Sequence, residues 1–155
     1  MAVLTRDDLK SQLTRGGLAP VYLLFGPETY LRDNAARYIT DRAFGEGDFR
    51  DFNDTSFSLN TEDNLTRAFA AAQQLPIMAS RRVIRITDIR ISATGYRDTI
   101  TEQHESLLTA YLSNPSQTSV VLLIADELNG VRKMSKLLKD NTTVVEFKPD
   151  RKSVV

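Results

Sequence analysis

The fold is decided by the stretch Pro20-Val21-Tyr22-Leu23-Leu24-Phe25-Gly26-Pro27-Glu28-Thr29-Tyr30-Leu31. Its unbroken apolar run, Val21 to Phe25, predicts a central strand that is covered on both faces. Gly26 then allows a tight turn into an amphipathic helix, which is the order of elements that opens a P-loop domain. The pattern Gly-x-x-x-x-Gly-Lys-Ser/Thr is not met, and Glu28 would repel a phosphate from the first helical turn. The segment therefore predicts the shape of a nucleotide-binding fold with a degenerate phosphate-binding loop.

Helical and strand patterns alternate along the rest of the chain. The helical patterns run from Leu4 to Leu13, Leu31 to Ile39, Leu65 to Ala72, Leu107 to Leu112 and Val131 to Lys139. The further strand patterns are a weak, short one at Phe49 to Phe52 and clearer ones at Arg82 to Ile89, Ser119 to Ala125 and Thr143 to Phe147. Five strands separated by helices predict one α/β domain of three layers, over residues 1–150, with a five-stranded, mostly parallel sheet.

Composition limits the classes of function. The chain has 155 residues, of which 41% are hydrophobic, so it can bury a sizeable core. Cysteine is absent, which excludes disulfides, thiolate metal sites and thiol catalysis and makes the cytoplasm the default compartment. Lys plus Arg equals Asp plus Glu at 20 each, so no net field draws the domain to DNA or to an anionic membrane. The segment from Met1 to Leu13 has no continuous apolar stretch and predicts neither a signal peptide nor a membrane span.

An enzyme remains an open alternative. Leu122 to Glu127 imitates a Walker B strand, with Asp126 and Glu127 in the place of magnesium-binding acids and Asp88 as a third carboxylate. The absent phosphate-gripping loop favours another role for the two acids, which is to cap the helix that follows. His104 is the only histidine, so it has no partner for a paired metal site or a charge relay, and we expect it to be solvated.

Two further segments have competing interpretations. The only basic stretch comprises Arg81, Arg82, Arg85 and Arg90. No aromatic stacking platform accompanies these arginines, which favours the exposed face of a strand over a nucleic-acid surface. The second segment runs from Gln73 to Ser80, where a helix ends at a proline and a bulky apolar pair follows on a loop that should be polar. Such a pair is either tucked under the helix or offered to a partner, and the sequence alone favours tucking.

These segments together resemble a known family. The resemblance rests on residues 20–26 with Glu28, Tyr30 and Leu31, on residues 75–83, and on Leu112, Asn114-Pro115, Thr118 and the strand through Ala125. It runs from about Leu4 to Pro149. The chain is similar to the N-terminal domain of the delta subunit of bacterial DNA polymerase III, the clamp-loader subunit that binds the sliding clamp.

The resemblance implies an AAA+-like domain that neither binds nor hydrolyses ATP, requires no cofactor or metal, and works by binding. It implies that Gln73 is a polar anchor and that Ile77 and Met78 are a hydrophobic pair that enters an apolar pocket on the clamp. Leu75, Pro76 and Arg81 complete the implied clamp-binding segment. Met78 stands where an aromatic residue is common in the family, and its flexible thioether side chain also fills irregular apolar pockets.

The resemblance also implies partners and missing parts. The expected partners are the beta sliding clamp and, through a lid and a collar domain that are not in these 155 residues, other clamp-loader subunits. Contact with DNA is expected to be indirect at most, and no membrane is involved. Arg151 to Val155 matches nothing in the family and stays an unassigned tail. The alternative function is a divergent P-loop-type nucleoside triphosphatase that uses Glu28, Asp126 and Glu127 with magnesium.

Overall fold

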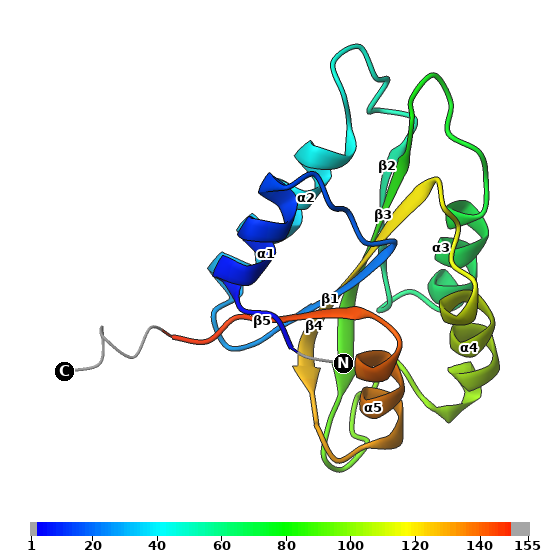
Figure 1. Cartoon of the computed structure of the whole chain (residues 1–155). Coiled ribbons are helices and arrows are strands. Elements are labelled where there is room, and N and C mark those ends of the chain that lie inside the picture. The colour runs from blue at the N-terminus through cyan, green and yellow to red at the C-terminus, as the bar shows by residue number, and fades with distance from the viewer. Residues whose placement is uncertain (1–2, 150–155) are drawn as a thin grey trace.

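A computed structural model of the chain describes residues 3–149 and has three layers (Figure 1). The five strands are β1 (Val21–Phe25), β2 (Asp54–Ser58), β3 (Arg82–Ile91), β4 (Ser119–Leu128) and β5 (Thr143–Glu146). They form one sheet in the order β2-β3-β4-β1-β5, and every neighbouring pair is parallel. The α/β class and the five-stranded sheet predicted from the sequence are therefore confirmed. The tail from Arg151 to Val155 lies outside the described residues.

Helices cover both faces of the sheet. They are α1 (Arg6–Thr14), α2 (Thr29–Ala43), α3 (Asn64–Ala72), α4 (Glu105–Ser113), which a short 3-10 turn at Glu102–His104 precedes, and α5 (Lys133–Asp140). Helices α1 and α2 lie on one face, and α3, α4 and α5 lie on the other (Figure 1). Such layers are expected of a parallel sheet, because each crossover from one parallel strand to the next in the chain places a helix on a face.

Strand β1 is apolar throughout because both of its faces are covered. It lies between β4 and β5, with Leu23 paired to Leu123 on one side and to Val144 on the other. Leu23 packs in the cluster beneath α3, α4 and α5, whereas Leu24 packs in the cluster beneath α1 and α2. Both side chains are fully buried. A strand with one solvated face would instead have alternated with polar residues.

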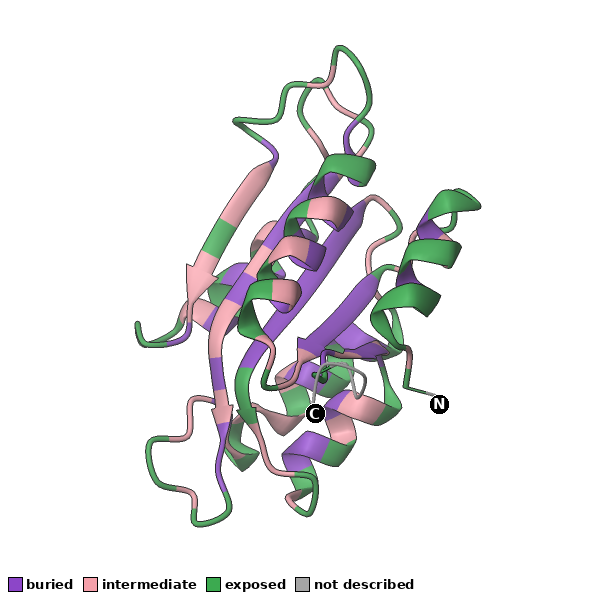
Figure 2. Cartoon of the chain, turned by 90° about the vertical axis from the view of Figure 1, so that its left-hand side faces the viewer, coloured by how far each residue is buried: buried purple, intermediate pink, exposed green. Residues whose placement is uncertain are grey.

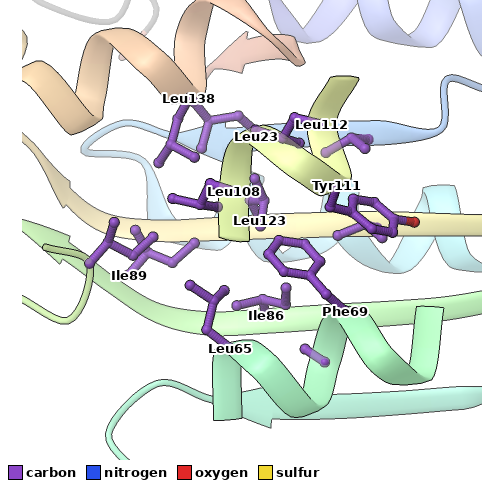
Figure 3. Close-up of a cluster of buried hydrophobic side chains, with 14 of the residues drawn as sticks. Leu23, Leu65, Phe69, Ile86, Ile89, Leu108, Tyr111, Leu112, Leu123 and Leu138 are labelled. Carbon is purple, nitrogen blue, oxygen red and sulfur yellow. The ribbon is translucent and has the colours of Figure 1, made fainter. Parts of the chain in front are cut away.

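The larger cluster joins three helices to the sheet (Figure 3). Phe69 of α3 stacks on Tyr111 of α4 with ring centroids 4.6 Å apart, and both rings are almost completely buried. Ile86 of β3 and Leu123 of β4 lie in the same cluster. Each such buried side chain contributes about 1.5–3 kcal/mol relative to its exposed state, so this face supplies much of the stability. Burial is concentrated in the inner strands, while the loops at the two ends of the sheet are largely exposed (Figure 2).

Strand β2 lies elsewhere than the sequence predicts. The predicted strand at Phe49 to Phe52 is wrong, because these residues form a loop and the strand begins at Asp54. Strand β2 is an edge strand paired only to β3, and its sequence, Asp-Thr-Ser-Phe-Ser, has a single large apolar residue. The pairing of its backbone with β3, and not burial of its side chains, defines it as a strand, which is why hydrophobic pattern alone misplaces it.

Candidate functional site

The degenerate phosphate-binding turn at Gly26 and the apolar segment Gln73–Arg81 lie at opposite edges of the sheet. In a parallel sheet every strand ends at the same edge, so the turn at Gly26 and the acids Asp88 and Asp126 belong to the carboxyl edge. The segment Gln73–Arg81 immediately precedes β3 and therefore lies at the amino edge. The turn at Gly26 and the Gln73–Arg81 loop are thus separated by the length of the strands.

The turn at Gly26 is filled by the chain itself. Gly26 has a φ of +131°, and a Cβ atom there would lie 2.3 Å from the carbonyl oxygen of Phe147. The Phe147 N–H donates to the Phe25 carbonyl at 2.8 Å, and the Glu28 N–H donates to the Phe147 carbonyl at 3.2 Å. An amide that would face a phosphate in a P-loop therefore has a backbone partner in this turn.

Asp126 has a structural partner at the carboxyl edge. Nη1 of the buried Arg32 donates to Asp126 Oδ1 at 2.9 Å and to the Ala125 carbonyl at 3.0 Å, while its Nε donates to Asp33 Oδ1 at 3.0 Å. Burial acts to lower the pKa of Arg32, but its hydrogen bonds to Asp33 and Asp126 outweigh burial and leave that pKa raised. Asp126 thus compensates a cation that α2 brings to the sheet.

The capping role expected for Asp126 and Glu127 is wrong. Strand β4 continues through both residues to Leu128, and Arg132 is the N-cap residue of α5. Asp88 accepts hydrogen bonds from the hydroxyls of Ser58 and Thr87. Within residues 3–149, no three His, Asp or Glu side chains gather in a metal-binding arrangement.

The arginines of β3 are not an exposed face, contrary to the sequence interpretation. Arg82 is buried, and Arg85 is half-buried with its Nη2 2.6 Å from Asp54 Oδ1. Arg90 donates from Nη2 to Asn60 Oδ1 at 2.7 Å. Arg81, at the end of the apolar loop, is half-buried. Most of this basic stretch therefore serves packing between β3 and its neighbours, which the charge pattern alone could not indicate.

His104 also differs from expectation. It is half-buried, and its Nδ1 accepts a hydrogen bond from the Thr101 N–H at 3.1 Å. The imidazole thus caps the short 3-10 turn before α4. Separately, no helix within residues 3–149 combines the length and the apolar character needed to cross a bilayer.

The apolar loop is exposed at the amino edge. Helix α3 ends at Ala72, and the exposed Gln73 is its C-cap residue. Leu75 is 77% exposed, Ile77 52% and Met78 74%, while Pro76 is half-buried. The prediction that the apolar pair is tucked under the helix is therefore wrong. Three large apolar side chains project into solvent within four residues, a composition typical of a surface that binds a protein partner.

Asn53 fixes the backbone of this loop. Its side chain is fully buried; Oδ1 accepts from the Ile77 N–H at 2.8 Å, and Nδ2 donates to the Ile77 carbonyl at 2.7 Å. The Phe49 N–H also donates to the Met78 carbonyl at 3.0 Å. Met78 has a φ of +53°, in the left-handed region that a non-glycine residue adopts at a cost. The bonds on both sides of it hold this conformation, so the loop presents its side chains from an ordered backbone.

Sequence reasoning missed Asn53. It lies 24 residues before Ile77, in a run of charged and polar residues, and asparagine is common in any loop. The one available signal was its position directly before a strand and after two aromatic residues, which does not identify a partner so far along the chain.

Comparisons with known proteins give a consistent result. A family model described as DNA polymerase III, delta subunit, matches residues 22–148. The chain is 30% identical over 143 residues to DNA polymerase III subunit delta of Bacillus subtilis (strain 168), covering 91% of this chain and 41% of that protein. A solved structure of the Bacillus subtilis DNA clamp loader delta protein superposes with a TM-score of 0.77 at 28% identity, covering 92% of this chain and 42% of that one. The chain thus spans about two fifths of the length of these relatives.

Proposed function

The chain belongs to the DNA polymerase III delta subunit family, and from this membership we propose that its Gln73–Arg81 loop binds the sliding clamp on which a clamp loader acts. One observation carries the proposal. Ile77 and Met78 are exposed on a loop whose backbone is fixed by a buried side chain, at the edge of the sheet opposite the degenerate phosphate-binding turn. A pair of exposed apolar side chains on an ordered loop loses little conformational entropy when it binds.

Each residue of the loop has a distinct part in the proposed contact. Ile77 and Met78 enter an apolar pocket on the clamp, and each contributes about 1.5–3 kcal/mol in transfer terms when it is fully buried. Leu75, the most exposed of the three apolar side chains, adds contact area beside them. Gln73 supplies a polar anchor at the end of α3, and Arg81 contributes at the rim, where charged groups influence association rate more than affinity.

The proposed domain is not a catalyst. It favours an open clamp only to the extent that it binds the open ring more tightly than the closed one. The turn at Gly26 supports this role, because its Glu28 amide has the Phe147 carbonyl as a partner and the sequence has no lysine at the phosphate-binding position. We propose accordingly that nucleotide is handled elsewhere in the loader, and that residues 1–150 are the clamp-binding domain. Lid and collar domains beyond this segment would contact the other subunits.

The test is calorimetric titration of the chain with the sliding clamp of its own organism. The Ile77→Ala/Met78→Ala variant is expected to lose at least about tenfold in affinity while staying folded. Val131→Ala is a matched control, because Val131 is 80% exposed in the loop between β4 and α5 at the other edge of the sheet and its truncation should leave binding unchanged. Equal affinity in all three proteins would remove the loop from the contact.

The nucleoside triphosphatase alternative is tested with the same samples. The proposal predicts no magnesium-dependent ATP binding at millimolar nucleotide. Binding that is abolished by Asp126→Asn would favour the alternative, since Asp126 is the acid that an enzyme of this fold would use at the carboxyl edge.

A further inference from the structure

A second set of exposed apolar side chains lies beside the Gln73–Arg81 loop. Phe49 and Phe52, in the loop that leads into β2, stack on each other with ring centroids 5.3 Å apart. They remain 45% and 58% exposed. Within residues 3–149, five of the nine exposed large hydrophobic side chains belong to this loop and to the Gln73–Arg81 loop. The remaining four are Val3, Tyr30, Tyr96 and Val131.

The two loops form one surface. They project side by side from the amino edge of the sheet in both orientations of the molecule (Figures 1 and 2). The hydrogen bond from the Phe49 N–H to the Met78 carbonyl joins them directly. Asn53 adds a second connection, since Nδ2 donates both to the Phe49 carbonyl and to the Ile77 carbonyl. A third runs from the Ser80 hydroxyl to Asp48 Oδ2 at 3.2 Å.

We propose that the Phe49–Phe52 stack is a second contact of the clamp-binding surface, so that the docking site spans both loops. This inference rests on the proposed function of the Gln73–Arg81 loop. The occupant is the same partner, because Phe49 and Met78 are both exposed and a backbone hydrogen bond holds them next to each other at the same edge of the sheet.

The stacked rings suit such a contact. Each aromatic side chain has a large apolar area and few rotatable bonds, so covering it loses little side-chain entropy. Stacking leaves roughly half of each ring facing solvent, and no residue of the described chain covers that half. Aromatic residues are enriched among those that dominate protein–protein affinity, usually next to other apolar anchors. The partner is therefore expected to present an apolar shelf adjacent to the pocket that takes Ile77 and Met78.

The experiment is a titration of the sliding clamp with four forms of the full 155-residue chain. They are the natural sequence, Phe49→Ala/Phe52→Ala, Ile77→Ala/Met78→Ala, and the control Tyr30→Ala/Tyr96→Ala. Tyr30 and Tyr96 are 75% and 76% exposed and lie at the carboxyl edge, so the control removes two exposed rings far from the proposed surface. A fifth form, Phe52→Arg, keeps the volume of the side chain but places a charge where the partner would desolvate it. Circular dichroism establishes that each variant is folded.

The expected result is a loss of about tenfold or more in affinity for Phe49→Ala/Phe52→Ala and for Phe52→Arg, with no loss for the tyrosine control. If the natural chain binds, the Ile77–Met78 variant is weakened and both phenylalanine variants bind normally, the inference is overturned while the proposed function stands. If the natural chain does not bind the clamp, or the Ile77–Met78 variant binds normally, the proposed function itself fails.

Discussion

Asn53 shows how a single polar side chain can hold an exposed loop in one conformation. Its amide gives and receives hydrogen bonds with the backbone of Ile77, as a neighbouring strand would. Because the side chain is fully buried, removing it leaves the backbone groups that it bonds without a partner in the folded chain. If the loop binds the clamp as proposed, its affinity depends on a residue that the clamp does not touch.

We expect Asn53→Ala to lower the free energy of unfolding by about 1–3 kcal/mol, because it leaves the Ile77 N–H and two carbonyls without partners. Clamp affinity should fall as well, since the loop must then be ordered on binding. Urea denaturation and calorimetry measure the two effects. The control is Asn114→Ala, at an exposed asparagine. An Asn53→Ala protein of natural stability would contradict the role assigned to the amide.

Gly26 is required by a contact rather than by a ligand. Gly26→Ala would bring a Cβ atom within 2.3 Å of the Phe147 carbonyl oxygen. We expect a loss of between about 2 and 6 kcal/mol, the sum of steric overlap and backbone strain. Gly16 also has a positive φ, of +80°, but nothing lies within 4 Å of a Cβ there, so Gly16→Ala should cost about 1–2 kcal/mol. Chemical denaturation compares the two, and equal losses would mean that the Phe147 contact is unimportant.

For individual residues, the sequence predicted the positions of loops and turns better than it predicted which side chains are buried or exposed. The pattern predicted a loop from Gln73 to Ser80 and a turn at Gly26, and the structure has both. The local pattern alone predicted neither the exposure of Ile77 and Met78, which only the resemblance implied, nor the burial of Arg82 and the connection through Asn53. Each depends on which segment lies opposite in space, and local periodicity has no information about that.

Among the elements, α1 has the clearest sequence signal for its start. The Thr5 side chain accepts from the Asp8 N–H at 3.2 Å, and Asp8 Oδ2 accepts from the Thr5 N–H at 3.0 Å, which completes a capping box. Thr5→Ala is expected to lower the free energy of unfolding by about 1 kcal/mol, because the helix loses an N-cap acceptor. Denaturation at neutral pH measures this change.

The same box predicts a dependence on pH. The hydrogen bond from the Thr5 backbone, with a further one from its side chain, lowers the pKa of Asp8 below its usual 3.8. Since the folded-state pKa is the lower one, the stability that ionised Asp8 contributes is present above about pH 4 and is lost as the pH falls through the folded value. We expect Asp8→Asn to reduce the loss of stability between pH 5 and pH 2. Asp7→Asn, in the same turn, should leave the contribution of Asp8 to that loss unchanged. Denaturation curves at both pH values test this, and an unaltered pH profile for Asp8→Asn would contradict it.

The lengths of β3 and β4 show where hydrophobic pattern stops being sufficient. The sequence predicts strands that end at Ile89 and Ala125. In the structure the two strands stay paired beyond these residues, because Arg90 pairs with Glu127 and Ile91 pairs with Leu128. The register shifts between Ile86 and Ile89, where Asp88 has a φ of +61°. Such a bulge breaks the period of two on which the prediction depends, so the polar ends of the strands were assigned to loops and to helix caps.

For the whole molecule, the order of elements was sufficient to predict the architecture, because alternating strands and helices permit few other layer arrangements.

The sheet separates the buried apolar side chains into two clusters, one on each face. Leu23→Ala and Leu24→Ala act on different clusters, and each is expected to lower the free energy of unfolding by about 2–5 kcal/mol. Urea denaturation of the two variants tests whether both faces are tightly packed. A cost below about 1 kcal/mol for either would mean that one face is loosely covered.

The strand order also determines when the chain can fold during synthesis. Strand β1 is made before the other four described strands, yet its two neighbours are β4 and β5, the last of them. About a hundred residues must be added after Phe25 before β4 exists, which takes the ribosome roughly 5 to 20 seconds. During that interval the apolar segment from Val21 to Phe25 has neither of its neighbouring strands to pair with, so its side chains are open to non-native contacts. We therefore expect the order of translation, and not only the stability of the finished domain, to influence how readily this segment misassembles.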